Sequence, residues 1–121
     1  MYELTVRAHF DAAHSLRGYR GECSALHGHT WDVEATVRGQ ELDDIGIVYD
    51  FKTLKEDLAA VLAPLDHGFL NEVAPFTEIS PTAENLARTL FEALRERIDP
   101  GVEVAEVAVW ESPVARIVYR P

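Results

Sequence analysis

The sequence contains one cysteine, few basic residues and no long apolar run. A single cysteine excludes an internal disulfide, so this sulfur is a small core residue, a ligand or a reactive thiol, all of which suit a reducing compartment. No apolar run reaches the roughly 18 residues that a membrane-spanning helix needs, and the chain opens on a strand pattern rather than a signal peptide. We therefore expect a cytoplasmic protein without membrane contacts.

Basic residues are outnumbered, with 11 Lys and Arg against 21 Asp and Glu and a formal net charge of −10. A surface that tracks nucleic acid phosphates needs a basic excess, so nucleic acid is not an expected partner. The length of 121 residues and the 47% hydrophobic content indicate one ordinary globular domain. We expect that domain to span residues 1–121.

Two segments near the N-terminus alternate strictly between apolar and polar residues, as half-buried β-strands do. Residues 27–37 place His27 and His29 on the apolar parity, with Trp31 and three further apolar residues. Residues 2–14 alternate in the same way and place His14 on their apolar parity. If the two segments pair as antiparallel neighbours, all three imidazoles face the same interior.

Three converging imidazoles are a typical ligand set for a metal ion. They leave a tetrahedral cation one open position, as in catalytic zinc sites, whereas a closed structural site needs a fourth protein ligand. Cys23 lies three residues before this pair of histidines, with Ser24, Ala25 and Leu26 between it and His27, and it is one candidate for the fourth ligand. Alternatively, a nearby cation lowers the pKa of this thiol and makes Cys23 a base or nucleophile. Iron, cobalt or nickel also suit three imidazoles.

The rest of the chain predicts two helices followed by two strands. Asp50 is positioned to cap a helix that Pro64 ends, and Ser80-Pro81 is expected to start a second helix that Pro100-Gly101 terminates. Residues 65–71 are expected to be irregular. Residues 102–111 are apolar on both parities, so both faces of that strand are expected to be covered, and a last strand begins at Ala115.

The predicted fold is therefore α+β with the order ββααββ: a four-stranded antiparallel sheet with two helices on one face. Such a sheet leaves its other face and both edge strands exposed in a monomer. Because exposed edges pair readily, we expect the subunits to assemble through them and to place some site residues at a subunit interface.

Several other polar residues have two interpretations. Asp66-His67 is either a dyad in which the carboxylate orients the imidazole or a turn with a capping aspartate. Glu111, at the end of an apolar strand beside Trp110, either reaches solvent or recognises a ligand. Small basic clusters, which are available for a phosphate but are ordinary surface when taken alone, comprise Arg17, Arg20, Lys52 and Lys55.

Six motifs in order resemble one family along nearly the whole chain. They are Phe10-Asp-Ala-Ala-His14-Ser-Leu16, Cys23-x-x-x-His27-Gly-His29, Asp50-Phe51, Leu65-Asp66-His67, Pro81-Thr-Ala-Glu-Asn85 and Trp110-Glu111-Ser112. The chain resembles the 6-pyruvoyl-tetrahydropterin synthase family. The three-residue spacing between Cys23 and His27 is similar to that of the 6-carboxytetrahydropterin synthase branch, which acts in 7-deazaguanine and queuosine biosynthesis.

The resemblance implies a tunnelling fold whose subunits form a barrel, with two rings stacked into a homohexamer. It implies zinc (Zn2+) on His14, His27 and His29 and a pterin triphosphate substrate, 7,8-dihydroneopterin triphosphate. It further implies that the catalytic set is Cys23, Asp66 and His67. Substrate-binding positions implied by the match are Glu111, as the pterin-ring anchor, with Thr82 and Glu84.

Three alternatives remain at this point. The same fold can make 6-pyruvoyltetrahydropterin. A noncatalytic zinc-binding protein would use Cys23 as the fourth ligand, so Cys23→Ala would lose the metal. A zinc hydrolase that uses metal-bound hydroxide would keep its activity in Cys23→Ala.

Overall fold

A computed structural model describes residues 1–17 and 25–121. Two long strands come first, β1 (Tyr2–His14) and β2 (His27–Gly39). They are followed by helix α1 (Phe51–Leu62), the short strand β3 (Gly68–Phe69), a 3₁₀ turn η2 (Leu70–Glu72) and helix α2 (Ala83–Arg97). Strands β4 (Glu103–Ser112) and β5 (Ala115–Tyr119) complete the order. In the described ranges no helix has the length and apolarity needed to cross a membrane.

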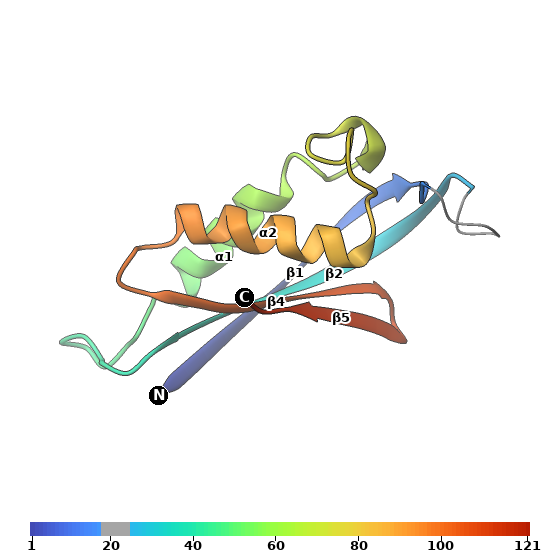
Figure 1. The fold of residues 1–121 in the computed structure, drawn as a ribbon. Coiled ribbons are helices and arrows are strands. Elements are labelled where there is room, and N and C mark those ends of the chain that lie inside the picture. Colours follow the sequence, from blue (N-terminus) through green and yellow to red (C-terminus); the bar gives the residue numbers. More distant parts are fainter. Residues whose placement is uncertain (18–24) are drawn as a thin grey trace.

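The sheet has five strands in the order β3-β1-β2-β4-β5. The β1–β2, β2–β4 and β4–β5 pairs are antiparallel, as expected, and both helices cover one face (Figure 1). The expectation of four antiparallel strands is incomplete, because β3 pairs in parallel with Ala12 and Ala13 of β1. Residues 68 and 69 lie in a segment expected to be irregular, and only tertiary pairing with β1 makes them a strand.

The start of α1 matches the sequence prediction, since the Asp50 side chain accepts a hydrogen bond from the backbone N–H of Lys52. The predicted start of α2 at Ser80-Pro81 is wrong by two residues. Thr82 is the N-cap, and its hydroxyl accepts from the Asn85 backbone N–H at 3.1 Å. Ser80 also carries a capping hydroxyl, but that hydroxyl accepts from the backbone N–H of Arg17 rather than from the helix, which leaves the cap to Thr82.

The core lies between the sheet and the two helices. The apolar parities of β1 and β2 face α1 and α2, and their largest fully buried side chains include Trp31 and Phe10. A register shift between β2 and β4 turns Val104 to the same face as Val107 and Val109, although its sequence parity differs.

The helix-free face of the sheet is polar except around Trp110. Arg7 and Arg116 lie over the ring of Trp110, at 5.4 and 5.7 Å from its centroid, and the indole N–H donates to Glu34. Ala108, two residues earlier on β4, is also buried. Strand β4 is therefore covered on both faces, as its composition predicts. The helices cover one face, and side chains of the neighbouring strands cover the other.

Candidate metal centre and acid–base dyad

The end of β1 and the start of β2 bring three imidazoles together. His14 pairs with His27 in the antiparallel register, and Ala12 pairs with His29. Ring centroids are 4.5 Å apart for His14 and His27, 5.1 Å for His14 and His29, and 4.6 Å for His27 and His29. The predicted convergence on the apolar face is confirmed in geometry, because the alternation of each strand and the register between them place all three rings together.

Backbone carbonyls fix the orientation of two of these rings. The Nδ1–H of His14 donates to the Pro81 carbonyl at 2.8 Å, and the Nδ1–H of His27 donates to the Ala25 carbonyl at 2.7 Å. Since a carbonyl only accepts, each neutral ring keeps its proton on Nδ1 and presents an Nε2 lone pair. A carbonyl that orients a histidine in this way is the usual second contact of a metal-binding imidazole.

The Nε2 atoms are spaced as ligands of one cation. Those of His14 and His27 lie 2.9 Å apart, and in the tautomers set by the carbonyls their lone pairs face each other. Two facing lone pairs repel unless an electrophile lies between them. Ligand atoms of a tetrahedral zinc ion with bonds of about 2.0–2.1 Å are about 3.3 Å apart, close to the distance observed here. The residues present therefore fit a metal ion.

Burial favours the neutral form of two of these rings, those of His14 and His29. His14 is fully buried, and burial is the largest cause that lowers its pKa; burial also lowers the pKa of His29, against the opposing effect of Glu111. Among the described residues, the buried Nε2 of His29 is the side-chain atom left without a hydrogen-bond partner. A buried polar nitrogen without a protein partner is expected to have another one, and a ring nitrogen beside two further imidazoles is suited to bind a cation.

Glu111 lies against the histidines rather than in solvent. Its Oε1 is 3.1 Å from Nε2 of His29 and 3.7 Å from Nε2 of His14. The contact between Glu111 and His29 does not have hydrogen-bond geometry, so Nε2 of His29 has no hydrogen-bond partner. One ligand atom from each of the four side chains falls within 4.8 Å of all the others, so this carboxylate belongs to the candidate metal centre. Its predicted contact with a pterin ring stays a prediction.

Trp31 and Phe10 form the floor of the centre. The Trp31 ring packs edge-on against His14 and His29, at 4.9 and 5.1 Å between centroids, and stacks with Phe10 at 6.0 Å. The indole N–H donates to the carbonyl of Ala12. Trp31 was not among the predicted site residues, although its position two residues after His29 gives it the same parity as the histidines.

Asp66 and His67 form the predicted dyad, with His67 Nδ1 2.9 Å from Asp66 Oδ2. The backbone of Asp11 holds both residues: its N–H donates to Asp66 Oδ1 at 3.0 Å, and its carbonyl accepts from the His67 N–H at 2.6 Å. The Asp11 N–H is the largest cause that lowers the pKa of Asp66. His67 has a left-handed backbone (φ 58°), unusual for a residue with a side chain, and this carbonyl bond stabilises it.

The dyad and the histidine centre are separate within one chain. Asp66 and His67 cluster with the carboxylate of Asp11, which projects from the opposite face of β1 to His14. Both dyad side chains are well exposed, at 41% and 79%. Asp11 and its hydrogen-bond partner Thr30 were not identified from the sequence; the signal was their polar parity beside the histidine segment.

Two further predicted site residues lie at the start of α2. Thr82 caps α2, next to the Pro81 carbonyl that orients His14, and Glu84 is exposed in the first turn. Cys23 and Arg20 lie outside the described residues, so their predicted roles are untested.

Of the other candidate phosphate-binding cations, Arg17 is engaged by backbone carbonyls and the two lysines lie on α1. Arg17 donates through Nη1 to the carbonyls of Phe76 and Ile79. Lys52 and Lys55 lie on α1, whose first residue Phe51 lies beside the start of β1. About ten residues of strand, or roughly 33 Å, separate that end of β1 from His14.

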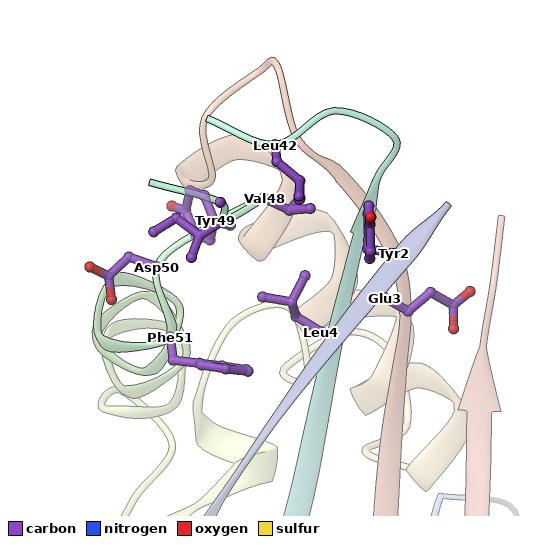
Figure 2. Close-up of a pocket in the computed structure, with 10 residues that line it drawn as sticks. Tyr2, Glu3, Leu4, Leu42, Val48, Tyr49, Asp50 and Phe51 are labelled. Carbon is purple, nitrogen blue, oxygen red and sulfur yellow. The ribbon is translucent and has the colours of Figure 1, made fainter. Parts of the chain in front are cut away.

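A cavity of about 340 Å³ opens at this distant end, between the start of β1, residues 42–49 and the start of α1. Its lining is largely apolar, and Figure 2 shows the carboxylates of Glu3 and Asp50 directed away from Leu4 and Phe51. Two polar members are engaged elsewhere, because Asp50 caps α1 and the Tyr49 hydroxyl donates to Asp57. The histidine end therefore carries the reactive groups.

Comparison with known proteins identifies the family of this arrangement. The model of the family described as 6-pyruvoyl tetrahydropterin synthase matches residues 3–121. The chain belongs to the 6-pyruvoyl tetrahydropterin synthase family. The resemblance inferred from the six motifs is thus confirmed over almost the whole chain.

Relatives in the 6-pyruvoyl tetrahydropterin synthase family carry several names. The 6-carboxy-5,6,7,8-tetrahydropterin synthase of Bacillus subtilis is 36% identical, over 99% of this chain and 86% of the relative. The dihydroneopterin monophosphate aldolase of Pyrococcus furiosus is also 36% identical, over 89% of this chain and 88% of the relative. The solved structure of Caenorhabditis elegans 6-pyruvoyl tetrahydropterin synthase aligns with a TM-score of 0.88 at 27% identity, covering 99% and 95% of the two chains.

Proposed function

We propose that this protein is a zinc-dependent 6-carboxy-5,6,7,8-tetrahydropterin synthase. It converts 7,8-dihydroneopterin triphosphate and water to 6-carboxytetrahydropterin, acetaldehyde and triphosphate in 7-deazaguanine and queuosine biosynthesis. The observation that supports this most strongly is the set of three converging imidazoles, two of them oriented by carbonyls. The Bacillus subtilis relative, which aligns along 99% of the chain, supports the choice of branch.

His14, His27 and His29 hold the ion in this proposal. When bound there, zinc supplies Lewis acidity, which makes a hydrogen on carbon next to a bound hydroxyl more acidic and stabilises a developing oxyanion. Trp31 and Phe10 exclude water from below the site, because both side chains are almost completely buried.

Proton transfer falls to Cys23 and to the dyad. The Cys23 thiolate removes protons from the substrate side chain. Asp66 accepts the Nδ1–H of His67 and thereby fixes the tautomer, so Nε2 of His67 is the atom that exchanges a proton with the substrate. Thr82 and Glu84, at the start of α2 beside the residue that contacts His14, supply polar groups for the pterin ring. The carboxylate of Glu111 is the anchor of that ring in this proposal.

Assembly is part of the proposal. The dyad is exposed and faces away from the histidine centre of its own chain, so one substrate meets both only if a second subunit contributes one of them. The edges of the sheet, β5 on one side and the part of β1 beyond β3 on the other, offer backbone groups for such pairing. A homohexamer of two stacked trimeric rings satisfies this requirement.

A second candidate is a dihydroneopterin phosphate aldolase. The Pyrococcus furiosus relative has the same 36% identity as the Bacillus subtilis relative, and an aldol cleavage beside a metal-bound hydroxyl uses the same groups. Formation of 6-pyruvoyltetrahydropterin is a third possible outcome in this family. The three reactions differ in their products, which makes product identity the decisive measurement.

The test is to incubate the zinc-loaded protein with 7,8-dihydroneopterin triphosphate and to identify the products by mass spectrometry, with Cys23→Ala alongside. We expect 6-carboxytetrahydropterin and acetaldehyde from the wild type. Loss of a general base typically costs about 10²–10⁴-fold in rate, so Cys23→Ala is expected to retain its zinc and lose turnover. A pyruvoyl product, or glycolaldehyde triphosphate with a hydroxymethylpterin, refutes the branch assignment, and a zinc-free Cys23→Ala favours a closed structural site.

A further inference from the structure

Glu111 has the position of a metal ligand in the present structure. Its Oε1 lies 3.1 and 3.7 Å from the Nε2 atoms of His29 and His14, and those of His14 and His27 are 2.9 Å apart. These distances bracket the separation of about 3.3 Å expected for ligands of one tetrahedral zinc ion. A simple hydrogen bond from His29 to this carboxylate is not the explanation, because Nε2 of His29 and Oε1 of Glu111 do not have hydrogen-bond geometry.

The local fold directs this side chain to the centre. Val107, Val109 and Glu111 alternate onto the helix-covered face of β4, whereas Trp110 points to the other face. The β4–β5 register shifts between Trp110 and Ser112, which leaves Glu111 opposite no residue of β5. Such irregularities commonly re-aim a side chain beside a reactive site.

We infer that Glu111 is the fourth protein ligand of the ion in the substrate-free protein and that a substrate hydroxyl displaces it. The inference rests on the metal site of the proposed function. Three neutral imidazoles leave the charge of a divalent ion uncompensated, and a carboxylate lowers the local charge from +2 to +1. Four protein ligands close a zinc site, whereas turnover requires an open position, so binding of substrate must exchange this ligand. The released carboxylate then accepts hydrogen bonds from substrate N–H or O–H groups.

The test uses the full-length protein loaded with Co²⁺, whose visible absorption reports its ligand set. Glu111→Gln keeps the size of the side chain but replaces the anionic ligand by a neutral amide. Loss of even an outer-shell partner costs about 10- to 100-fold in affinity, so for a direct ligand we expect a loss in Co²⁺ affinity of at least about 100-fold, measured by competition with a chromogenic chelator, and a change in the visible spectrum. Adding 7,8-dihydroneopterin is expected to change the wild-type spectrum as a hydroxyl replaces the carboxylate.

Glu106→Gln is the matched control, because Glu106 is a carboxylate on the same strand that pairs with Arg120. It is expected to leave affinity and spectrum unchanged. Should Glu111→Gln fold poorly, Glu111→Asp keeps the charge on a shorter side chain and is expected to weaken binding in the same direction.

Two failures are distinguishable. If the wild type binds Co²⁺ and Glu111→Gln matches it in affinity and spectrum, the inference is refuted while the proposed function stands. If the wild type binds neither Co²⁺ nor Zn²⁺, the metal centre of the proposed function is refuted and the inference falls with it.

Discussion

Zinc is expected to stabilise the folded protein through the three histidines, and His29→Asn is expected to abolish that effect. The imidazoles already converge, so the ion binds the folded state without a large rearrangement. Free zinc at about 100 times the dissociation constant adds about 2.7 kcal/mol to the free energy of unfolding. An unfolding entropy of about 2.1 cal/mol/K per residue gives about 0.25 kcal/mol/K for this chain, so the melting temperature rises by about 10 °C.

The assay is differential scanning calorimetry at one fixed subunit concentration, with zinc removed by a chelator and then restored. His9→Asn is the control, since His9 is an exposed histidine on the polar parity of β1, the strand that carries His14. Zinc should raise the melting temperature of this control as much as that of the wild type. The reasoning is refuted if zinc leaves the wild-type melting temperature unchanged or raises that of His29→Asn by the same amount.

Two further predictions concern the segment between β2 and α1. Burial, followed by the hydrogen bond to Asp57, raises the pKa of Tyr49 to about 12. Because this folded-state pKa lies above the unfolded value of about 10, the contribution of Tyr49 is complete below about pH 10 and is lost as the pH rises through about 12. Tyr49→Phe should therefore lower the free energy of unfolding by about 1–2 kcal/mol at neutral pH, measured by urea unfolding. The difference in stability from the wild type should disappear as the pH rises from about 10 to about 12. A difference that does not depend on pH would contradict the assignment. A Cβ on Gly39, the last residue of β2, would lie 2.8 Å from Val48 Cγ1. Gly39→Ala should therefore lower the free energy of unfolding by about 1–3 kcal/mol. The same substitution in a Val48→Ala background should lower it much less.

Much of the histidine centre was predictable because strand alternation has a fixed period. Once residues 2–14 and 27–37 are recognised as alternating segments, His14, His27 and His29 must share a face, and antiparallel pairing of neighbouring strands brings them together. The cap of α1 was predictable for a similar reason, since Asp50 acts on a residue only two positions away.

Features that depend on distant partners were not predictable. β3 exists only because residues 68 and 69 meet β1, and the start of α2 depended on which of two adjacent local signals, Pro81 or Thr82, satisfies a free N–H. The sequence left Glu111 free to face solvent or a ligand, and a register shift in the β4–β5 pair accompanies its position at the histidines. The separation of Asp66-His67 from the histidines likewise follows from Asp11, on the far face of β1.

The pairing of His14 with His27 has a consequence for how this protein can change over time. Because these two histidines form the last pair of the β1–β2 ladder, the distance between their rings is set by the strands and not by the length of the connection after His14. Within either strand, by contrast, a single inserted or deleted residue would turn every later side chain to the opposite face and remove a histidine from the centre. Length variation at this end of the molecule is therefore compatible with the three-histidine arrangement between the strands and incompatible with it inside them.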